Sequence, residues 1–351
     1  MMRLLLLFLL VLTWHSEASA DIFRADTEWK VKPDFEKSAA ARESISGADC
    51  APDGGWCLAA NDEKNYAQFF KIGKNRLDPD KKGVIRLLPK KVDGEKMDEI
   101  DAEGVVFVPS GDDNTPSYFY VTGSHGLSRG GDLQPSRYWL FRFPVETGTG
   151  KPTFTFDDKK VVPEVERTDL LADTIEANPD LASYVDQKLD QNGVTIEGIS
   201  EMNGDMLFGL RSPCLANHAF ILRVPGSELF KKTPPSSTTE KVGLGDNVGV
   251  RDLTRVNDGL LILAGRSDDR RGVQDFTCDE KRTPPSPAPS LWFWSGKNGD
   301  AAKPYGALPG IDVNASAETL LVLEETQTAY RVLVLFDGEK NGAPVEFLVN
   351  K

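Results

Sequence analysis

The sequence has little histidine, one long apolar run and no surplus of positive charge. Only three histidines occur among 351 residues, and the four cysteines lack the spacing of a zinc site. After residues 4–12, no stretch approaches the roughly 20 apolar residues that a membrane span needs. The net charge of −13 argues against nucleic acid or an anionic membrane as a partner, because both would repel the chain.

The N-terminus carries the features of an export signal. Arg3 precedes the apolar residues 4–12, and a polar stretch then ends in Ala18-Ser19-Ala20. This order of charge, short apolar run and small-residue site is typical of a signal peptide. We therefore expect residues 1–20 to be removed near Ala20. Residues 21–351 would then form one periplasmic or secreted domain.

The cysteines are predicted to form disulfides, since an even number occurs in a chain that is expected to be exported. Cys50 and Cys57 flank the turn-forming residues 51–55, so a hairpin would bring them together. That pairing leaves Cys214 for Cys278. A metal site is the alternative, which the cysteine spacings and the scarcity of histidine disfavour.

A short element recurs along the chain: a polar residue, a small residue and an apolar residue, followed by a turn and further apolar strands. The copies are Ser46-Gly47-Ala48, Glu103-Gly104-Val105, Glu197-Gly198-Ile199, Arg251-Asp252-Leu253 and Glu318-Thr319-Leu320. Recurring units of three or four short strands predict an all-β protein, a β-propeller of five or six blades. A two-sheet sandwich is the alternative, but it does not explain the repeat. Residues 169–192 break the pattern and predict two short helices, separated by Pro179 and inserted between blades.

The innermost strand of each propeller blade lines the central channel, so the repeated polar residues should converge at one mouth together with Ser46 of the first copy. The polar ends of the second strands, including Asp62, should lie near the same region. The candidate binding residues at the mouth are Glu103, His125, Glu197, Arg211, Arg251, Asp252, Arg266 and Glu318.

Several roles are open for these residues. Glu103, Glu197 and Glu318 could hold a metal ion, or they could accept hydrogen bonds from neighbouring blades. Arg211 and Arg251 could serve as counter-ions, because buried carboxylates need such partners. His125 is the best single candidate for proton chemistry, since imidazole titrates near neutral pH.

The strings DAEG, GSHGLSR, TIEGIS, GLRSP and GVRDL resemble those of a family of exported bacterial proteins with a domain of unknown function. The resemblance covers about residues 46–336. More distantly, a Glu-Gly pair that opens an inner strand is similar to phytase-like propellers. That resemblance implies acidic residues at a channel mouth that hold calcium.

Two classes of function follow. The first is a binding module whose channel or rim holds a small molecule, a cation or another protein. The second is a calcium-dependent phosphoesterase-like hydrolase, with arginines holding an anionic substrate. We favour the first because no complete catalytic set is visible, and the sequence leaves open whether the protein is an enzyme.

Overall fold

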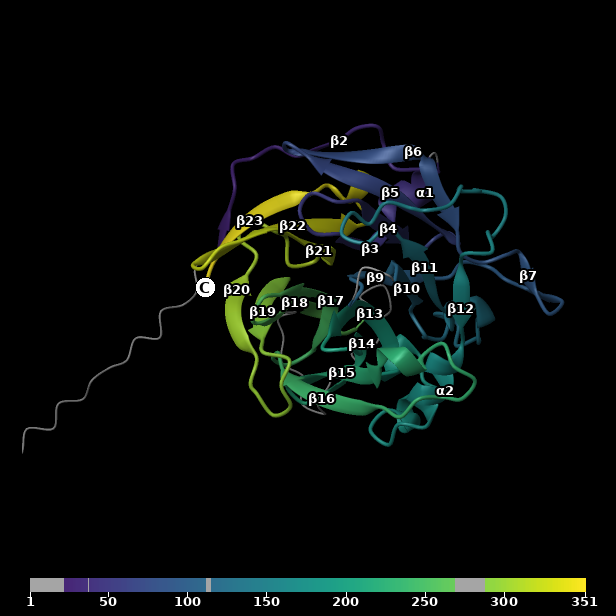
Figure 1. Ribbon diagram of the computed structural model, residues 1–351. Coiled ribbons are helices and arrows are strands. Elements are labelled where there is room, and N and C mark those ends of the chain that lie inside the picture. Colours follow the sequence, from purple (N-terminus) through teal and green to yellow (C-terminus); the bar gives the residue numbers. More distant parts are fainter. Residues whose placement is uncertain (1–21, 37, 112–114, 269–287) are drawn as a thin grey trace, which may run out of the picture.

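The computed structural model of the chain describes residues 22–36, 38–111, 115–268 and 288–351. Five sheets of four or five strands surround one axis, so the fold is a five-bladed β-propeller (Figure 1). The all-β prediction is confirmed, and the blade number, which the sequence left at five or six, is five.

Each blade is numbered by the position of its innermost strand along the chain. Blade 1 contains β3 (Ile45–Cys50), β4 (Cys57–Asn61), β5 (Tyr66–Gly73), β6 (Arg76–Arg86) and β2 (Lys30–Val31). Blade 2 contains β9 (Ala102–Val108), β10 (Ser117–Gly123), β11 (Leu140–Val145) and β12 (Glu166–Thr168). Blade 3 contains β13 (Thr195–Met202), β14 (Asp205–Leu215), β15 (His218–Pro225) and β16 (Thr238–Gly243).

The last two blades follow the same antiparallel order from the axis outward. Blade 4 contains β17 (Val248–Val256), β18 (Gly259–Arg266), β19 (Ser290–Trp294) and β20 (Lys303–Ala307). Blade 5 contains β21 (Ser316–Glu325), β22 (Ala329–Asp337), β23 (Val345–Asn350) and β1 (Ile22–Arg24). The strand at residues 331–336 is therefore part of the second strand of blade 5.

The two ends of the described chain join in one sheet. The N-terminal strand β1 pairs antiparallel with the C-terminal strand β23, with Ile22 opposite Val349. The inner strands also close a ring, since β21 contacts β3 just as β3 contacts β9. This closure ties the first blade to the last.

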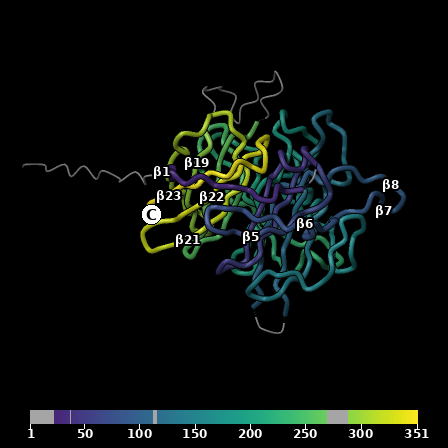
Figure 2. The backbone as a smooth tube through the Cα atoms, turned by 90° about the horizontal axis from the view of Figure 1, so that it is seen from above, coloured from purple at the N-terminus to yellow at the C-terminus, as the bar shows by residue number. Residues whose placement is uncertain are grey.

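A few elements lie outside the five sheets. A small hairpin of β7 (Lys91–Val92) and β8 (Glu95–Lys96) projects from the body (Figure 2). The helix α1 (Ala39–Glu43) precedes blade 1, and α2 (Leu170–Glu176) follows blade 2. Single 3₁₀ turns lie at Pro135–Arg137, Ala182–Tyr184, Leu189–Gln191, Gly226–Glu228 and Lys340–Gly342.

The insertion expected at residues 169–192 is present between blades 2 and 3. It consists of α2 and two 3₁₀ turns, and Pro179 lies between the helix and the first turn. Among the described helices, none is long and apolar enough to cross a bilayer.

Buried apolar side chains fill the spaces between neighbouring blades. One cluster lies between each of the five pairs of neighbouring blades, so each twisted sheet packs against apolar side chains on both faces. Between blades 1 and 2, for example, the rings of Phe69 and Phe119 meet edge to face with centroids 5.7 Å apart. Such packing stabilises the ring without any single central core.

The inner strands approach one another so closely that glycine is needed at the contact. A Cβ atom on Gly47 would lie 2.9 Å from the carbonyl oxygen of Glu103 and from the Cα of Gly104. A Cβ atom on Gly198 would lie 2.9 Å from the backbone nitrogen of Leu253. The small residue of the repeat therefore permits backbone-to-backbone packing around the axis.

The predicted disulfide between Cys50 and Cys57 is confirmed, and it joins the end of β3 to the start of β4. Cys278 lies outside the described residues, so its pairing with Cys214 stays a prediction.

Replacing Gly198 with alanine should destabilise the propeller by about 1–3 kcal/mol, because the added methyl group meets rigid backbone of the next inner strand. Urea denaturation measures the effect. The matched control is Gly111→Ala, since a Cβ atom there would meet nothing within 4 Å. Equal stability of the two variants would contradict the role assigned to the close approach.

Candidate functional site

Three glutamates from three blades meet at the axis. Glu103 is the second residue of β9, and Glu197 and Glu318 are the third residues of β13 and β21. All three side chains are buried, and each offers a carboxylate oxygen within 4.8 Å of the others. The convergence that the repeat predicts is therefore present. We call this end of the axis, with Arg251, the charged mouth.

Arg251 lies between two of the three glutamates. Its Nη2 atom is 3.4 Å from Oε2 of Glu197 and forms an ion pair with Oε1 of Glu318. Arg211 in β14 donates from Nη1 to Oε1 of Glu197 at 3.0 Å. Burial opposes the charge of Arg251, but the two glutamates outweigh burial and raise its pKa. These contacts are the counter-ion arrangement that the sequence offered as an alternative.

Glu103 differs from the other two glutamates because no arginine among the described residues forms an ion pair with it, although the charge of Arg251 acts on it from farther away. In the part of the chain that the structure describes, no group forms a hydrogen bond or ion pair with its carboxylate. Burial raises the pKa of Glu103 well above its usual value, and the charge of Glu197 adds to the effect. A buried carboxyl in this position takes up a proton or binds a cation.

Further acidic groups surround Glu103. Asp101 precedes β9 and forms an ion pair with Nη1 of Arg137 at 2.9 Å. Asp62 follows β4, and its Oδ1 atom is buried without a hydrogen-bond partner among the described residues. Burial raises the pKa of Asp62 to about 8, and the charges of Asp337 and Asp101 contribute. Two carboxyls near one another, Asp62 and Glu103, thus lack a compensating arginine.

The second strands of the blades distribute acidic and basic side chains unevenly around the charged mouth. Those of blades 5 and 1 end at Asp337 and next to Asp62, whereas those of blades 3 and 4 carry Arg211 and Arg266. Acidic groups therefore gather on one side of the axis and basic groups on the other.

Asp252 accepts hydrogen bonds from the backbone of two neighbouring inner strands. Its Oδ1 accepts the backbone N–H of Leu253 at 2.8 Å, and its Oδ2 accepts that of Leu320 in the next blade at 2.7 Å. Asp49 makes the same kind of bridge from blade 1 to Phe107 of blade 2, at 2.7 Å. Both carboxylates hold neighbouring inner strands together and are occupied by backbone donors.

His125 does not fit the expected role in proton chemistry. It is buried against Tyr138, with ring centroids 5.7 Å apart, and its ring nitrogens have no partner among the described residues. Burial lowers the pKa of His125 to about 3, because the charged imidazolium would lose its hydration. The ring therefore stays neutral near pH 7.

Two other sequence candidates make local contacts. Arg266 forms an ion pair with Asp268 in the loop after its own strand, not with an axial glutamate. The hydroxyl of Ser46 donates to the backbone oxygen of Ser44 at 3.5 Å. Blade 1 therefore places no charged side chain from its inner strand among the glutamates.

Sequence reasoning missed Asp101, Arg137 and Asp337. Asp101 stands two residues before Glu103, a position at which the five copies of the repeat share no residue type. Asp337 ends the second strand of blade 5, as Asp62 follows that of blade 1. The two aspartates stand at different distances from their repeat elements, so the sequence pattern alone does not reveal that they are equivalent.

The family comparison agrees with the resemblance seen in the sequence. A family described as "Protein of unknown function (DUF3616)" matches residues 45–343, from the start of the first inner strand into blade 5. The chain belongs to the DUF3616 family. No curated protein sequence matches this DUF3616 protein.

Solved structures with similar folds include several glycoside hydrolases. A family 43 β-1,3-galactosidase shares 9% identity with a TM-score of 0.47, over 94% of this chain and 60% of that one. An exo-β-1,3-galactanase from Phanerochaete chrysosporium shares 9%, with a TM-score of 0.44, over 94% and 64%. An α-L-arabinofuranosidase from Podospora anserina shares 9%, with a TM-score of 0.43, over 92% and 96%.

These likenesses concern the fold alone. The DUF3616 chain spans less than two thirds of the length of the galactosidase and the galactanase.

Replacing Arg251 with glutamine should destabilise the protein by about 3–5 kcal/mol near neutral pH, because Glu197 and Glu318 would lose their shared buried cation. The deficit should shrink at pH 5, because burial raises the pKa of Glu318 well above its usual value and a proton can replace the lost cation at this carboxylate. Denaturant titrations at pH 5 and pH 8 measure both effects. The control is Arg76→Gln, whose ion pair with Asp78 is exposed and worth less than about 1 kcal/mol. A deficit that does not depend on pH would contradict the ion-pair explanation.

Replacing Asp62 with asparagine should flatten the dependence of stability on pH. The pKa of Asp62 in the folded protein is raised from 3.8 to about 8, so its favourable contribution is complete below the unfolded value. That contribution is lost as pH rises through about 8. Unfolding free energies from pH 4 to pH 9 should therefore fall less steeply in Asp62→Asn than in the wild type. The exposed Asp26→Asn should follow the wild-type curve, and parallel curves for all three proteins would disprove the assignment.

Proposed function

We propose that this protein is an exported binding module whose charged mouth binds a cation, or a ligand with a cationic group, beside Glu103. The observation that carries the proposal is the unequal distribution of counter-charge. Glu197 and Glu318 have arginine partners, whereas Glu103 is buried within 4.8 Å of their oxygens and has none among the described residues.

The position of Arg251 limits where the cation can sit. Its guanidinium lies between Glu197 and Glu318 and would repel a second cation placed centrally among the three glutamates. We therefore place the cation on the opposite side, toward Glu103 and the acidic groups of blades 1 and 2. This site is displaced from the centre of the three-glutamate site predicted from the sequence.

Calcium is the metal whose preference for carboxylate oxygen suits this side best. Glu103 would supply a carboxylate ligand, because it forms no ion pair with an arginine among the described residues. A bound cation would lower the pKa of Glu103 and stabilise its charged form. The cation would thus compensate the buried charge of the Glu103 carboxylate.

The phosphoesterase alternative has less support. It needs arginines that are free to hold an anionic substrate, but Arg211 and Arg251 are engaged with glutamates and Arg266 with Asp268. Their charge is directed at the protein's own carboxylates.

Export is supported by the signal-like N-terminus and by the disulfide between Cys50 and Cys57. Disulfides form and persist in oxidising compartments such as the periplasm or the extracellular space.

Calcium at millimolar concentration should raise the melting temperature of the wild type relative to chelator, because a ligand that binds only the folded state stabilises it by mass action. Glu103→Gln should abolish the rise, since it removes the uncompensated carboxylate while keeping the shape of the side chain. Differential scanning fluorimetry with calcium, magnesium or a quaternary ammonium salt identifies the kind of cation.

Glu95→Gln is the matched control, because Glu95 is exposed in the projecting strand β8 and makes the same change of charge. It should retain the full calcium response. If no cation raises the melting temperature of the wild type, Glu103 is a buried neutral acid and the proposal fails.

A further inference from the structure

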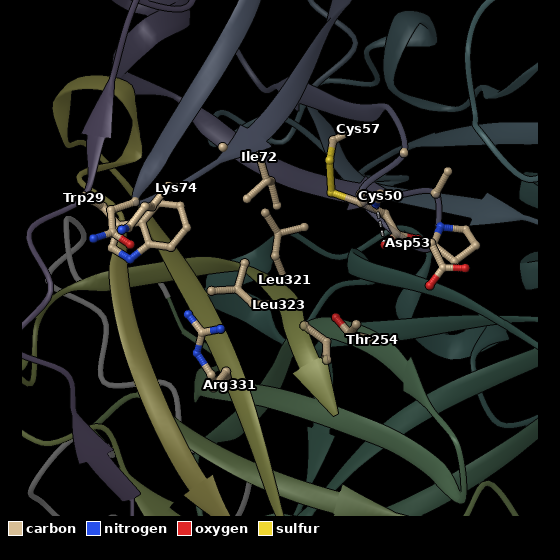
Figure 3. Close-up of a pocket in the computed structure, with 18 of the residues that line it drawn as sticks. Trp29, Cys50, Asp53, Cys57, Ile72, Lys74, Thr254, Leu321, Leu323 and Arg331 are labelled. Carbon is tan, nitrogen blue, oxygen red and sulfur yellow. Dashed lines mark hydrogen bonds between the residues drawn. A yellow bond between two sulfur atoms is a disulfide. The ribbon is translucent and has the colours of Figure 1, made fainter. Parts of the chain in front are cut away.

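A cavity of about 620 Å³ lies among residues of blades 1, 4 and 5, near the ends of inner strands whose starts form the charged mouth. Figure 3 shows the residues that line it. Its lining includes Cys50 at the end of β3, Thr254 near the end of β17 and Leu323 near the end of β21. Glu318 lies five residues before Leu323 on the same strand, a distance of roughly 16 Å in extended chain. We call this space the far cavity, and its volume is in the range of pockets that hold small molecules.

The floor of the far cavity is apolar. Leu321 and Leu323 from blade 5 lie near Ile72 from blade 1, with the disulfide between Cys50 and Cys57 at one side (Figure 3). These side chains come from strands far apart in the sequence. A ligand with an apolar group would remove their surface from water.

One wall of the far cavity is held by a shared carboxylate. Glu346 accepts a hydrogen bond from the indole Nε1 of Trp29 at 2.8 Å and another from Nε of Arg331 at 3.0 Å. Trp29 and Arg331 both line the cavity, whereas Glu346 stands behind them. The indole and the guanidinium are thus fixed in place before any ligand arrives.

The charged groups that line the far cavity are mainly basic. Lys74, Arg255 and Arg331 contribute three cations, although the chain as a whole carries −13. Arg255 and Arg331 are paired with glutamates outside the lining, but Lys74 has no ion pair or hydrogen bond with another described residue.

The acidic groups of the lining do not cancel this charge at Lys74. Asp49 is half-buried and accepts backbone N–H groups from Cys50 and Phe107. Asp53 lies on the opposite side of the cavity from Lys74 (Figure 3). An anionic group is therefore favoured at the side where Lys74 and Trp29 lie together.

We propose that the far cavity binds a small amphipathic anion, with its apolar part on Leu321 and Leu323 and its carboxylate or sulfonate beside Lys74. The disulfide between Cys50 and Cys57 supports the site, because it closes the hairpin whose residues 51–55 form part of the wall. This site is separate from the charged mouth and does not depend on cation binding there.

Two fluorescent probes with the same rings test the proposal. The anion 8-anilinonaphthalene-1-sulfonate carries a sulfonate, and N-phenyl-1-naphthylamine lacks it. The anionic probe should bind the native protein saturably, at one molecule per chain. Lys74→Gln should weaken its binding about twofold to fivefold, as expected for one exposed charge pair, and should leave the neutral probe unchanged.

Two further variants separate the cavity from other surfaces. Leu323→Asp puts a charge into the apolar floor and should weaken both probes by about tenfold or more. Lys81→Gln, at an exposed lysine outside the lining, should change neither. Melting curves establish that each variant is folded.

The proposal is overturned if Lys74→Gln leaves the sulfonate probe unaffected or weakens both probes equally, because the anion would then not be recognised. It is also overturned if Leu323→Asp leaves both probes unaffected, since binding would then occur elsewhere.

Discussion

Close approach of five inner strands around one axis is the constraint on which the rest of this structure depends. Gly47 and Gly198 permit it, because any larger residue would collide with the backbone of the next blade. The same approach brings Glu103, Glu197 and Glu318 within 4.8 Å of one another. Charges so close must be compensated, and Arg251 supplies the compensation from the fourth blade for two of the three.

The unequal compensation distinguishes the roles of residues that look alike in the repeat. Glu197 and Glu318 belong to an internal salt network that holds blades 3, 4 and 5 together. Glu103 occupies the equivalent position in blade 2, yet other acidic groups act on it and no arginine among the described residues forms an ion pair with it. Ligand binding is therefore expected at Glu103, where the salt network is incomplete. The carboxylates of Glu197 and Glu318 already pair with arginines and are less available to a ligand.

The two ends of the axis have different chemistry because each inner strand changes character along its length. The polar residues stand near the strand starts, and apolar residues such as Leu321 follow. One end thus gathers buried charge, while the other gathers apolar surface with basic groups at its edge. Similar propeller folds serve glycoside hydrolases, but a shared fold does not carry the chemistry of these two ends.

The repeat, the hairpin cysteines and the alternating apolar strands were sufficient to predict a propeller, the disulfide between Cys50 and Cys57, and the meeting of the axial glutamates. These features depend on local pattern and on the symmetry of blades around an axis. The pairing of β1 with β23 could not be predicted, because short terminal strands carry no pattern of their own. Only the tertiary structure showed that Arg251 forms ion pairs with Glu197 and Glu318 but not with Glu103, and that His125 is buried. Which charges meet depends on distances across the axis, and sequence spacing along one strand does not encode them.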